Sequence, residues 1–486
     1  MTASVFVANM AWVFLGVNWL LEGRWAEKWR RLRSNSLLHA FMALMLVYLL
    51  WTLGSHDMAV GFNELRTMLP LLVVPVVTLS SEPLSPSERR FVAAVYVVSV
   101  TVVSLVGLAR YATMPGLPYR DIVPTVSHIR FGLNVCLSLC LLVASMGALL
   151  RNDTPSLCRH RGWLLLLHVA DGMWLIVFLV IIQSYTSFII LAILLLLVLI
   201  LGICHVRSKR LAWPLAAVVA VIVVSLGVMR GYVNDYYGDC RRDADMVENG
   251  SYIYHNIDEG QLRRQWQAST GQHADAPTDN GYSAYSTLIR YLNATGRSKD
   301  SAGVASLSAS DRASIMRGVA NPVYDQHGMR RMVYAFLFEY ETYRCGGGVT
   351  NFSFLERLEL WRVAWHVFSA HPLLGVGIGD VVEACHTQLR AEGSELADTK
   401  KSPHNQYLTF LAAFGVVGFT IIMFFFVRAV WMQRRLYTPL AIAYICILLT
   451  SFVSENTLDT LAGSLFAAVP WVLLVHPVNE PFRPSD

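Results

Sequence analysis

Charged residues are scarce in this sequence. Only 15% of its 486 residues are Asp, Glu, Lys or Arg, whereas 55% are hydrophobic. Soluble globular domains carry about 25% charged residues, so this balance excludes an ordinary soluble protein. The composition instead predicts a chain whose main solvent is the lipid bilayer.

Several functional motifs are absent as well. The eight cysteines form no C-x-x-C pair, so no cysteine-built metal site is expected. The glycines match neither the dinucleotide fingerprint nor the Walker lysine loop, and no basic patch with interleaved aromatic residues suggests nucleic acid. Cys240, Cys345 and Cys385 lie in one hydrophilic stretch and offer partners for one disulfide.

Long apolar segments are plentiful. A helix of about 17 to 25 apolar residues spans the hydrocarbon core of a bilayer. The first such segment is followed by charged residues rather than a small-residue cleavage site, which predicts a retained helix and not a signal peptide. The sequence predicts about eleven spans, with ten to twelve as the range, at 4–21, 36–54, 66–80, 91–111, 129–150, 163–182, 187–205, 211–229, 405–427, 439–456 and 461–477.

Arg and Lys are distributed unequally between the connections. They concentrate in GRWAEKWRRLRSN, PSERR, RNDTPSLCRHR, HVRSKR and RAVWMQRR, whereas the alternate short connections carry only Arg66, Arg120 and Arg130. The positive-inside rule therefore places the first set in the cytoplasm and the long hydrophilic stretch outside. This predicts three parts: a membrane bundle over 1–230, an outer loop domain over 231–403, and further membrane helices over 404–486.

The outer stretch contains many aromatic residues, which predict a folded cap rather than a disordered loop. Within it, Leu355, Leu358, Trp365 and Phe368 recur at helical spacing and predict an amphipathic helix over 352–370. Such a helix suits the membrane surface; packing against the cap is the alternative. In the loop 371–380 that follows, alternating glycines form either an ordinary turn or a nest of N–H groups for an anion.

The stretch SPHNQYLTF places polar residues at the mouth of an apolar helix. Ser402 is a plausible N-cap, which would put His404 and Asn405 in the first turn. The positive end of the helix dipole favours a bound anion and disfavours imidazolium, so we expect a neutral His404 that can accept a proton. Lys400 and Lys401 would add to the attraction. The alternative is an ordinary polar helix start with snorkelling lysines.

Three arginines stand at the predicted outer ends of apolar helices, namely Arg66, Arg130 and Arg357. Guanidinium groups bind phosphate oxygens in pairs and stay charged. Each arginine alone is also explained as an interface anchor. Glu455 and Asp459, in SENTLDTLAG, either orient such a base or arginine or form a plain polar turn.

Three segments resemble the O-antigen ligase and O-antigen polymerase superfamily of bacterial membrane glycosyltransferases. They are ERLELWRVAWHVFSAHPLLGVGIGD, HNQYLTFLAAFGVVG and SENTLDTLAGSLFAAVPWVLL. The ligases share a pattern of His, then Asn, Ser or Gln, then nine residues, then Gly-x-x-Gly. His404, Asn405, Gly415 and Gly418 match this pattern in register.

The resemblance implies an all-α polytopic membrane protein, similar to type C glycosyltransferases, in the bacterial inner membrane with its large loop in the periplasm. It implies transfer of a glycan from undecaprenyl diphosphate to an acceptor hydroxyl, with inversion and without metal or cofactor. His404 matches the proposed general base. Arg357 matches an arginine proposed to hold the diphosphate. Asn405 and Lys401, at the mouth of the helix, are expected as further diphosphate-binding residues.

One departure from the family concerns a second arginine. Many relatives carry Ser-Arg-Thr-Gly or a similar sequence at a short outer hairpin, where this chain has Ser-Tyr-Thr-Ser at 184–187. Arg130 or Arg66 would then have to replace the missing guanidinium.

The sequence motifs do not distinguish between three acceptors. The acceptor is lipid A-core for a ligase, a lipid-linked repeat unit for a polymerase, or a Ser or Thr side chain for a protein glycosyltransferase; the Gly-x-x-Gly register and the single large loop favour the ligase. A transporter of lipid-linked sugars is the remaining alternative, with Asp171 as its main ionisable residue inside a span.

Overall fold

The structure is a computed structural model that describes residues 5–114, 117–151, 160–205, 209–241, 245–326, 328–350, 352–399, 401–432 and 438–475. It is mostly helical, with 74% helix and 2% strand. The chain divides into two compact units. Unit 1 consists of Met1–Leu201 together with Arg357–Asp486, and unit 2 is Gly202–Glu356. The predicted three-part division has other limits and stays a prediction.

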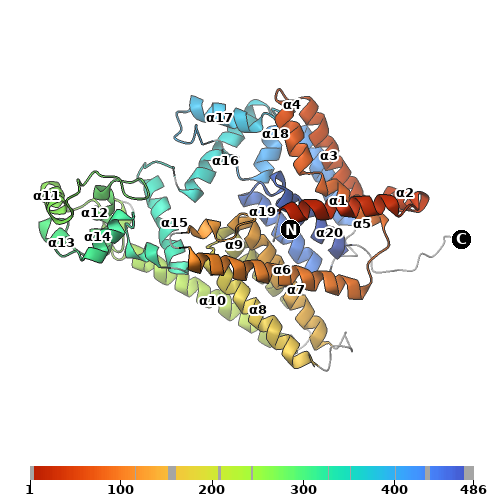
Figure 1. The fold of residues 1–486 in the computed structure, drawn as a ribbon, viewed down its shortest axis with the longest axis horizontal. Helices are drawn as coiled ribbons and strands as arrows, with labels where there is room; N and C mark the ends of the chain where they lie inside the picture. Colours follow the sequence, from red (N-terminus) through yellow and green to blue (C-terminus); the bar gives the residue numbers. More distant parts are fainter. Residues whose placement is uncertain are drawn as a thin grey trace. The chain divides into compact units, whose positions relative to one another are not determined.

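Unit 1 contains most of the apolar helices, and α10 (Lys209–Tyr237) belongs to unit 2 (Figure 1). Its helices are α1 (Val5–Leu21), α2 (Trp25–Arg33), α3 (Ser36–Leu53), α4 (Met58–Thr67), α5 (Pro70–Ser80), α6 (Pro86–Thr113), α7 (His128–Leu150), α8 (Arg161–Ile181), α9 (Tyr185–His205), α16 (Ser353–Ala370), α17 (Val381–Ala391), α18 (Gln406–Met432), α19 (Pro439–Ser454) and α20 (Leu461–Val475), with 3₁₀ turns η1 (Tyr119–Asp121) and η4 (Thr457–Asp459). Of these, α9 continues past the end of unit 1, and α16 begins in unit 2.

Local sequence explains where several of these helices begin. Asn35 caps α3 by accepting hydrogen bonds from the N–H groups of Leu37 and Leu38, at 3.0 and 3.2 Å. Ser85 and Glu88 form a reciprocal capping box at the start of α6. Short polar side chains at these positions satisfy N–H groups that have no partner inside the helix.

Six helical segments in the described part of the chain are long and apolar enough to cross a membrane. Shorter apolar helices at Met10–Leu21, Tyr185–Ile200, Pro439–Ser454 and Leu461–Leu474 coincide with further predicted spans. The chain is therefore a multi-pass, all-α membrane protein, while the count of eleven spans stays a prediction. The six segments are Ser36–Leu53, Met58–Ser80, Pro86–Thr113, His128–Leu150, Arg161–Ile181 and Gln406–Met432.

Helix α18 is interrupted at Gly415, whose backbone is not helical (φ 60°, ψ −172°). The chain following α16 packs against this break, and the N–H of Val416 donates to the carbonyl of Pro372 at 2.8 Å. A Cβ atom at Gly415 would lie 2.3 Å from the carbonyl oxygen of Leu373. The first glycine of Gly-x-x-Gly is thus required by a close approach of two backbones.

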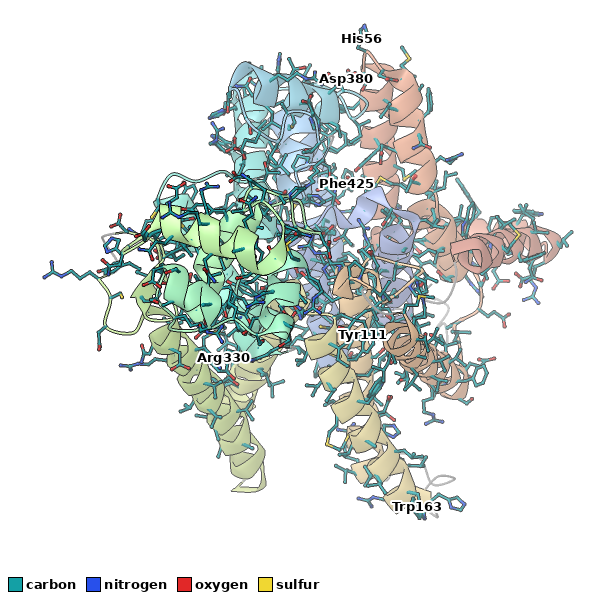
Figure 2. The ribbon with its side chains drawn as sticks, turned by 60° about the vertical axis from the view of Figure 1, so that its left-hand side comes forward. His56, Tyr111, Trp163, Arg330, Asp380 and Phe425 are labelled. Carbon is teal, nitrogen blue, oxygen red and sulfur yellow. The ribbon has the colours of Figure 1, made fainter. Side chains whose placement is uncertain are left out.

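The alternating glycines of the loop form a structural turn. The N–H groups of Val376 and Gly377 donate to carbonyls of α18, both at 2.9 Å, and that of Gly379 donates to the Ser55 hydroxyl at 3.1 Å. Because these donors are already used, the anion nest is wrong. Figure 2 places Asp380 beside His56, whose N–H its carboxylate accepts at 2.6 Å, so the loop is also fixed to the end of α3.

Replacing Gly375 by alanine is expected to destabilise the protein more than replacing Gly393. Both residues have left-handed backbones, at φ 65° and 66°, but an added Cβ meets backbone atoms of α18 at 2.5 Å only at Gly375. The left-handed strain, about 1–2 kcal/mol, is therefore common to both variants. Apparent Tm in detergent measures the difference; equal Tm losses would contradict the close packing described here.

The predicted surface helix corresponds to α16, and the residues it buries within the protein overlap the predicted apolar face only in part. Leu360, Val363, Ala364 and Val367 are buried, whereas Trp365 is 52% exposed. Leu355 of the predicted apolar face is buried as well, and the placement of Trp365 at the membrane surface stays a prediction.

Unit 2 is folded, as its aromatic content predicts. Helices α11 to α14 lie beside one another in Figure 1, and their core includes the buried Trp266, Leu288 and Ile315. A second core joins Tyr236 and Tyr334. The elements of unit 2 are α10 (Lys209–Tyr237), β1 (Val247–Glu248), β2 (Ser251–Tyr252), α11 (Glu259–Thr270), α12 (Ala284–Ala294), α13 (Ser301–Ala305), α14 (Ala309–Met316), η3 (Pro322–Asp325) and α15 (Met329–Arg344).

No disulfide joins the three cysteines of the predicted outer stretch. Cys240, Cys345 and Cys385 are free thiols in this structure. Cys345 ends α15 as its C-cap, followed by Gly346 at φ 74°, so the glycine run terminates the helix.

Candidate functional site

A buried carboxylate, Glu455, lies at the centre of a group of basic side chains in unit 1. It directly follows α19, and its side chain is 6% exposed. Arg357 of α16 donates from Nη2 to Oε1 at 3.2 Å. On the other oxygen, Oε2, Nη2 of Arg130 from α7 and Nδ1 of His404 each lie 3.7 Å away. Residues far apart in sequence therefore meet at one carboxylate.

The surroundings of Glu455 keep it ionised. Burial alone would raise the pKa of this carboxyl, but the facing His404 and the charges of Arg130 and Arg357 outweigh it and lower the pKa below its usual value. An ionised carboxylate between two guanidinium groups offsets their mutual repulsion. It therefore allows two arginines to be held close together before any anionic ligand binds.

His404 lies just before α18 and not in its first turn. Its backbone is left-handed, with φ 51°, a conformation in which histidine is among the more tolerated non-glycine residues. The N-cap is Asn405, whose Oδ1 accepts from the N–H of Leu408 at 3.1 Å. The predicted cap at Ser402 is therefore wrong, and the predicted diphosphate contact of Asn405 stays a prediction. The His404 side chain is 33% exposed, so it is open to a substrate.

The turn that carries Glu455 is fixed to the start of α18. Gln406 accepts from the N–H of Leu458 at 2.9 Å and donates to Asp459 at 3.3 Å. Asn456 also donates to Asp459, at 2.7 Å, and accepts from Thr409 at 3.1 Å. Burial raises the pKa of the Asp459 carboxyl despite the two amide donors. Asp459 thus has a structural role in the turn, whereas Glu455 faces the basic side chains.

Arg130 occupies the neighbourhood of the hairpin that lacks an arginine. That hairpin, at 184–187, packs against α7, since a Cβ at Gly132 would lie 2.0 Å from the Ser187 hydroxyl oxygen. Thr186 donates to Ser454, next to Glu455, at 3.1 Å. Arg130, two residues before Gly132, also donates to the carbonyl of Asn456 at 3.4 Å. A guanidinium from α7 therefore lies close to the hairpin at 184–187.

The other predicted basic residues have different surroundings. Arg66 is exposed on α4 and donates to Asn63 at 2.8 Å; among the residues that the structure describes, no contact joins it to Glu455. Lys401 accepts from His386 Nε2 through its carbonyl at 3.2 Å, and Lys400 lies outside the described residues. Asp171, the transporter candidate, accepts from Thr101 at 2.8 Å.

A sequence model of the family described as O-antigen ligase matches residues 172–423, more than half of the chain. The chain belongs to the O-antigen ligase family. This membership bears out the resemblance of the His404, Asn405, Gly415 and Gly418 pattern. A search of curated proteins finds no match.

The range matched by the family model does not include every residue of the Glu455 group. The matched range of this O-antigen ligase family member contains Arg357 and His404, begins after Arg130 and ends before Glu455. Glu455 was noted from the sequence only as an orienting residue or a turn. One sequence feature could have identified it. Glu455 is an acidic residue at the end of an apolar span, on the predicted outer side of the membrane where Arg130 and Arg357 also lie.

Proposed function

We propose that this protein transfers a glycan from undecaprenyl diphosphate to an acceptor hydroxyl, with lipid A-core as the acceptor, at the periplasmic face of the bacterial inner membrane. The family covers O-antigen ligases and related polymerases. The observation that carries the proposal is the meeting of His404, Arg130 and Arg357 at Glu455. It supplies a proton acceptor and two groups that can bind a diphosphate.

His404 is the proposed general base. With Nδ1 directed to Glu455, Nε2 is left to take the proton of the acceptor hydroxyl. The hydroxyl oxygen then attacks the anomeric carbon, and the bond from that carbon to the diphosphate oxygen breaks, with its electron pair leaving on the diphosphate. Attack opposite to the leaving group inverts the anomeric configuration. The Glu455 carboxylate stabilises the imidazolium that forms, and the 3.7 Å separation is expected to shorten when substrate binds.

Arg357 and Arg130 are the proposed diphosphate-binding residues. Each directs Nη2 toward Glu455, and the fork of a guanidinium can bind further oxygens at its other nitrogens. Charge that develops on the leaving diphosphate is stabilised most by groups that are already oriented. Arg66, Asn405 and Lys401 are proposed as secondary contacts of the same anion.

The side of the membrane proposed for the Glu455 group is argued from the basic residues at the opposite helix ends. Arg130 is at the start of α7 and Glu455 at the end of α19. The opposite ends of α7 and α18 carry the basic connections with Arg151 and Arg428. Under the positive-inside rule the Glu455 group then faces the periplasm. About eleven spans, a single large periplasmic loop and a type C glycosyltransferase-like arrangement complete the proposed architecture.

Arg130→Ala is expected to reduce glycan transfer about 10- to 100-fold more than Arg66→Ala, because only Arg130 joins the Glu455 group. Arg130→Lys should rescue little, since an ammonium cannot bind two phosphate oxygens in a fork. Transfer rates at saturating acceptor measure this. Equal losses for the two alanine variants would move the second phosphate contact away from Arg130.

The acceptor is decided by one experiment with purified protein in nanodiscs. The protein is incubated with an undecaprenyl-diphosphate glycan and, in parallel, with lipid A-core, a second lipid-linked repeat unit, or a Ser- and Thr-containing peptide. Mass gain on lipid A-core is expected. Mass gain on another acceptor replaces the ligase by a polymerase or a protein glycosyltransferase, and labelled lipid crossing the bilayer without any transfer replaces all three by transport.

A further inference from the structure

Unit 2 contains a pocket of about 560 Å³ that is distinct from the Glu455 group. This volume is within the range of about 300–1,000 Å³ typical of small-molecule sites. Its lining combines polar and apolar surface and comes from several elements of the unit. The lining residues are Asp235 of α10, Asn249 and Ser251 of the β-hairpin, Asn293 and Ala294 of α12, Gly296 after it, and Arg330 and Tyr334 of α15.

The hairpin side of the pocket has a specific backbone. Asn249 and Gly250 connect β1 to β2 with φ values of 54° and 72°, which a tight two-residue turn requires. Asn249 donates to the carbonyl of Ala294 at 3.0 Å, and Ser251 donates to Asn293 at 3.0 Å. Asn293 in turn donates to the carbonyl of Glu248 at 2.8 Å. These amide side chains therefore have fixed orientations at the pocket wall.

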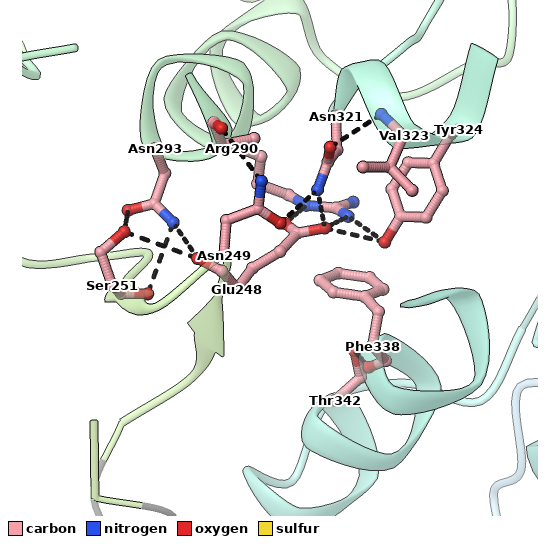
Figure 3. A network of polar contacts seen from close by, with 11 residues as sticks. Glu248, Asn249, Ser251, Arg290, Asn293, Asn321, Val323, Tyr324, Phe338 and Thr342 are labelled. Atoms are coloured by element: carbon pink, nitrogen blue, oxygen red, sulfur yellow. Dashed lines mark hydrogen bonds and ion pairs between the residues drawn. The ribbon is translucent and has the colours of Figure 1, made fainter. Parts of the chain in front are cut away.

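A buried polar network lies directly behind this wall (Figure 3). Glu248 is fully buried and receives two hydrogen bonds from Arg290, both at 3.1 Å. Tyr324 and Asn321 also donate to it, at 2.7 and 3.0 Å. Asn321 donates at the same time to Asn249, at 3.1 Å. Because the buried Glu248 charge is fully hydrogen-bonded, this network fixes the neighbouring amides of Asn249 and Asn293 before a ligand binds.

The opposite wall carries one charge of each sign. Arg330 Nη2 lies 3.8 Å from Asp235, and these side chains are 41% and 57% exposed. Arg330 also donates to the Tyr334 hydroxyl at 3.4 Å. The pair is too long for a hydrogen bond, so a ligand can bridge the carboxylate and the guanidinium. Because the two charges balance, the wall suits an uncharged ligand with many hydroxyl groups better than an anion.

We infer that this pocket binds sugar units of the glycan. The inference rests on the proposed function, which supplies the glycan as the substrate class. Vicinal hydroxyls both donate and accept, and the pocket offers them the Asp235 carboxylate and the Arg330 guanidinium beside a wall of amides held in place by the buried network. Unit 2 thereby recognises the saccharide. The pocket selects by sugar identity, which diphosphate contacts cannot do.

The test is saturation-transfer NMR on full-length protein in nanodiscs, with a panel of short bacterial oligosaccharides released from lipopolysaccharide by mild acid. Asp235→Ala/Arg330→Ala removes the charged wall without touching the buried network. Arg317→Ala/Asp325→Ala is the matched control, because that pair of unit 2 is 3.3 Å apart, similarly exposed, and outside the pocket lining. We expect at least about tenfold weaker binding in the pocket variant and unchanged binding in the control.

The same measurement in a His404→Asn background separates the two proposals. Binding should be unchanged there, since His404 is not in the pocket lining. Loss of oligosaccharide binding in the pocket variant alone supports the sugar-binding role of the pocket, even if no acceptor is ever glycosylated. Equal signals from the pocket variant and the control, or no signal from any oligosaccharide, would overturn it.

Discussion

His404→Ala is expected to lower the rate of glycan transfer by about 10²- to 10⁴-fold, the usual contribution of a positioned general base. The imidazole Nδ1 lies 3.7 Å from Glu455, and the side chain is exposed enough to meet an acceptor hydroxyl. Donor binding should change little, because the arginines proposed to bind the diphosphate remain. The measurements are the single-turnover transfer rate and the affinity for the lipid-diphosphate donor.

A second substitution controls for the backbone at this position. His404 has φ 51°, where alanine is strained but asparagine is well tolerated. His404→Asn should therefore keep the apparent Tm of the native protein and still lose transfer. Near-native transfer in a correctly inserted His404→Ala or His404→Asn protein would eliminate the proposed mechanism.

Glu455→Gln is expected to impair both stability and transfer at neutral pH. The substitution keeps the size of the side chain but leaves two guanidinium groups without the negative charge between them. Breaking a buried ion pair from one side costs about 3–5 kcal/mol. Glu383→Gln is the control, because the Glu383 pair with Arg390 is exposed on both sides and such pairs contribute about 0–1 kcal/mol. Apparent Tm and transfer rate are measured for both variants.

The effect of Glu455→Gln should depend on pH in a defined direction. The folded-state pKa of Glu455 lies below the ordinary value of 4.5, so its stabilising contribution is complete above that value and is lost as the pH falls through the lowered pKa. The Tm gap between native protein and variant should therefore narrow on acidification below about pH 5. A gap that stays constant, or one that narrows toward alkaline pH, would show that the charge of Glu455 is not responsible.

Local sequence was sufficient to predict several of the apolar helices. The predicted span 36–54 corresponds to α3 (Ser36–Leu53), and 439–456 to α19 (Pro439–Ser454). These segments are determined by a continuous apolar stretch and by residues next to it, such as the cap Asn35. The start of α18 was misplaced, because Ser402 and Asn405 are both good caps and only their tertiary contacts distinguish them.

The amino-acid sequence by itself determined the membrane class, the apolar helices and the family pattern around His404. The tertiary structure alone decided that Glu455 is the common partner of His404, Arg130 and Arg357, and that Arg66 is not. It also decided the fold and the pocket of unit 2. Helix signals come from neighbouring residues along the chain, whereas a site built from α7, α16, α18 and α19 depends on how those helices pack, which periodicity does not encode.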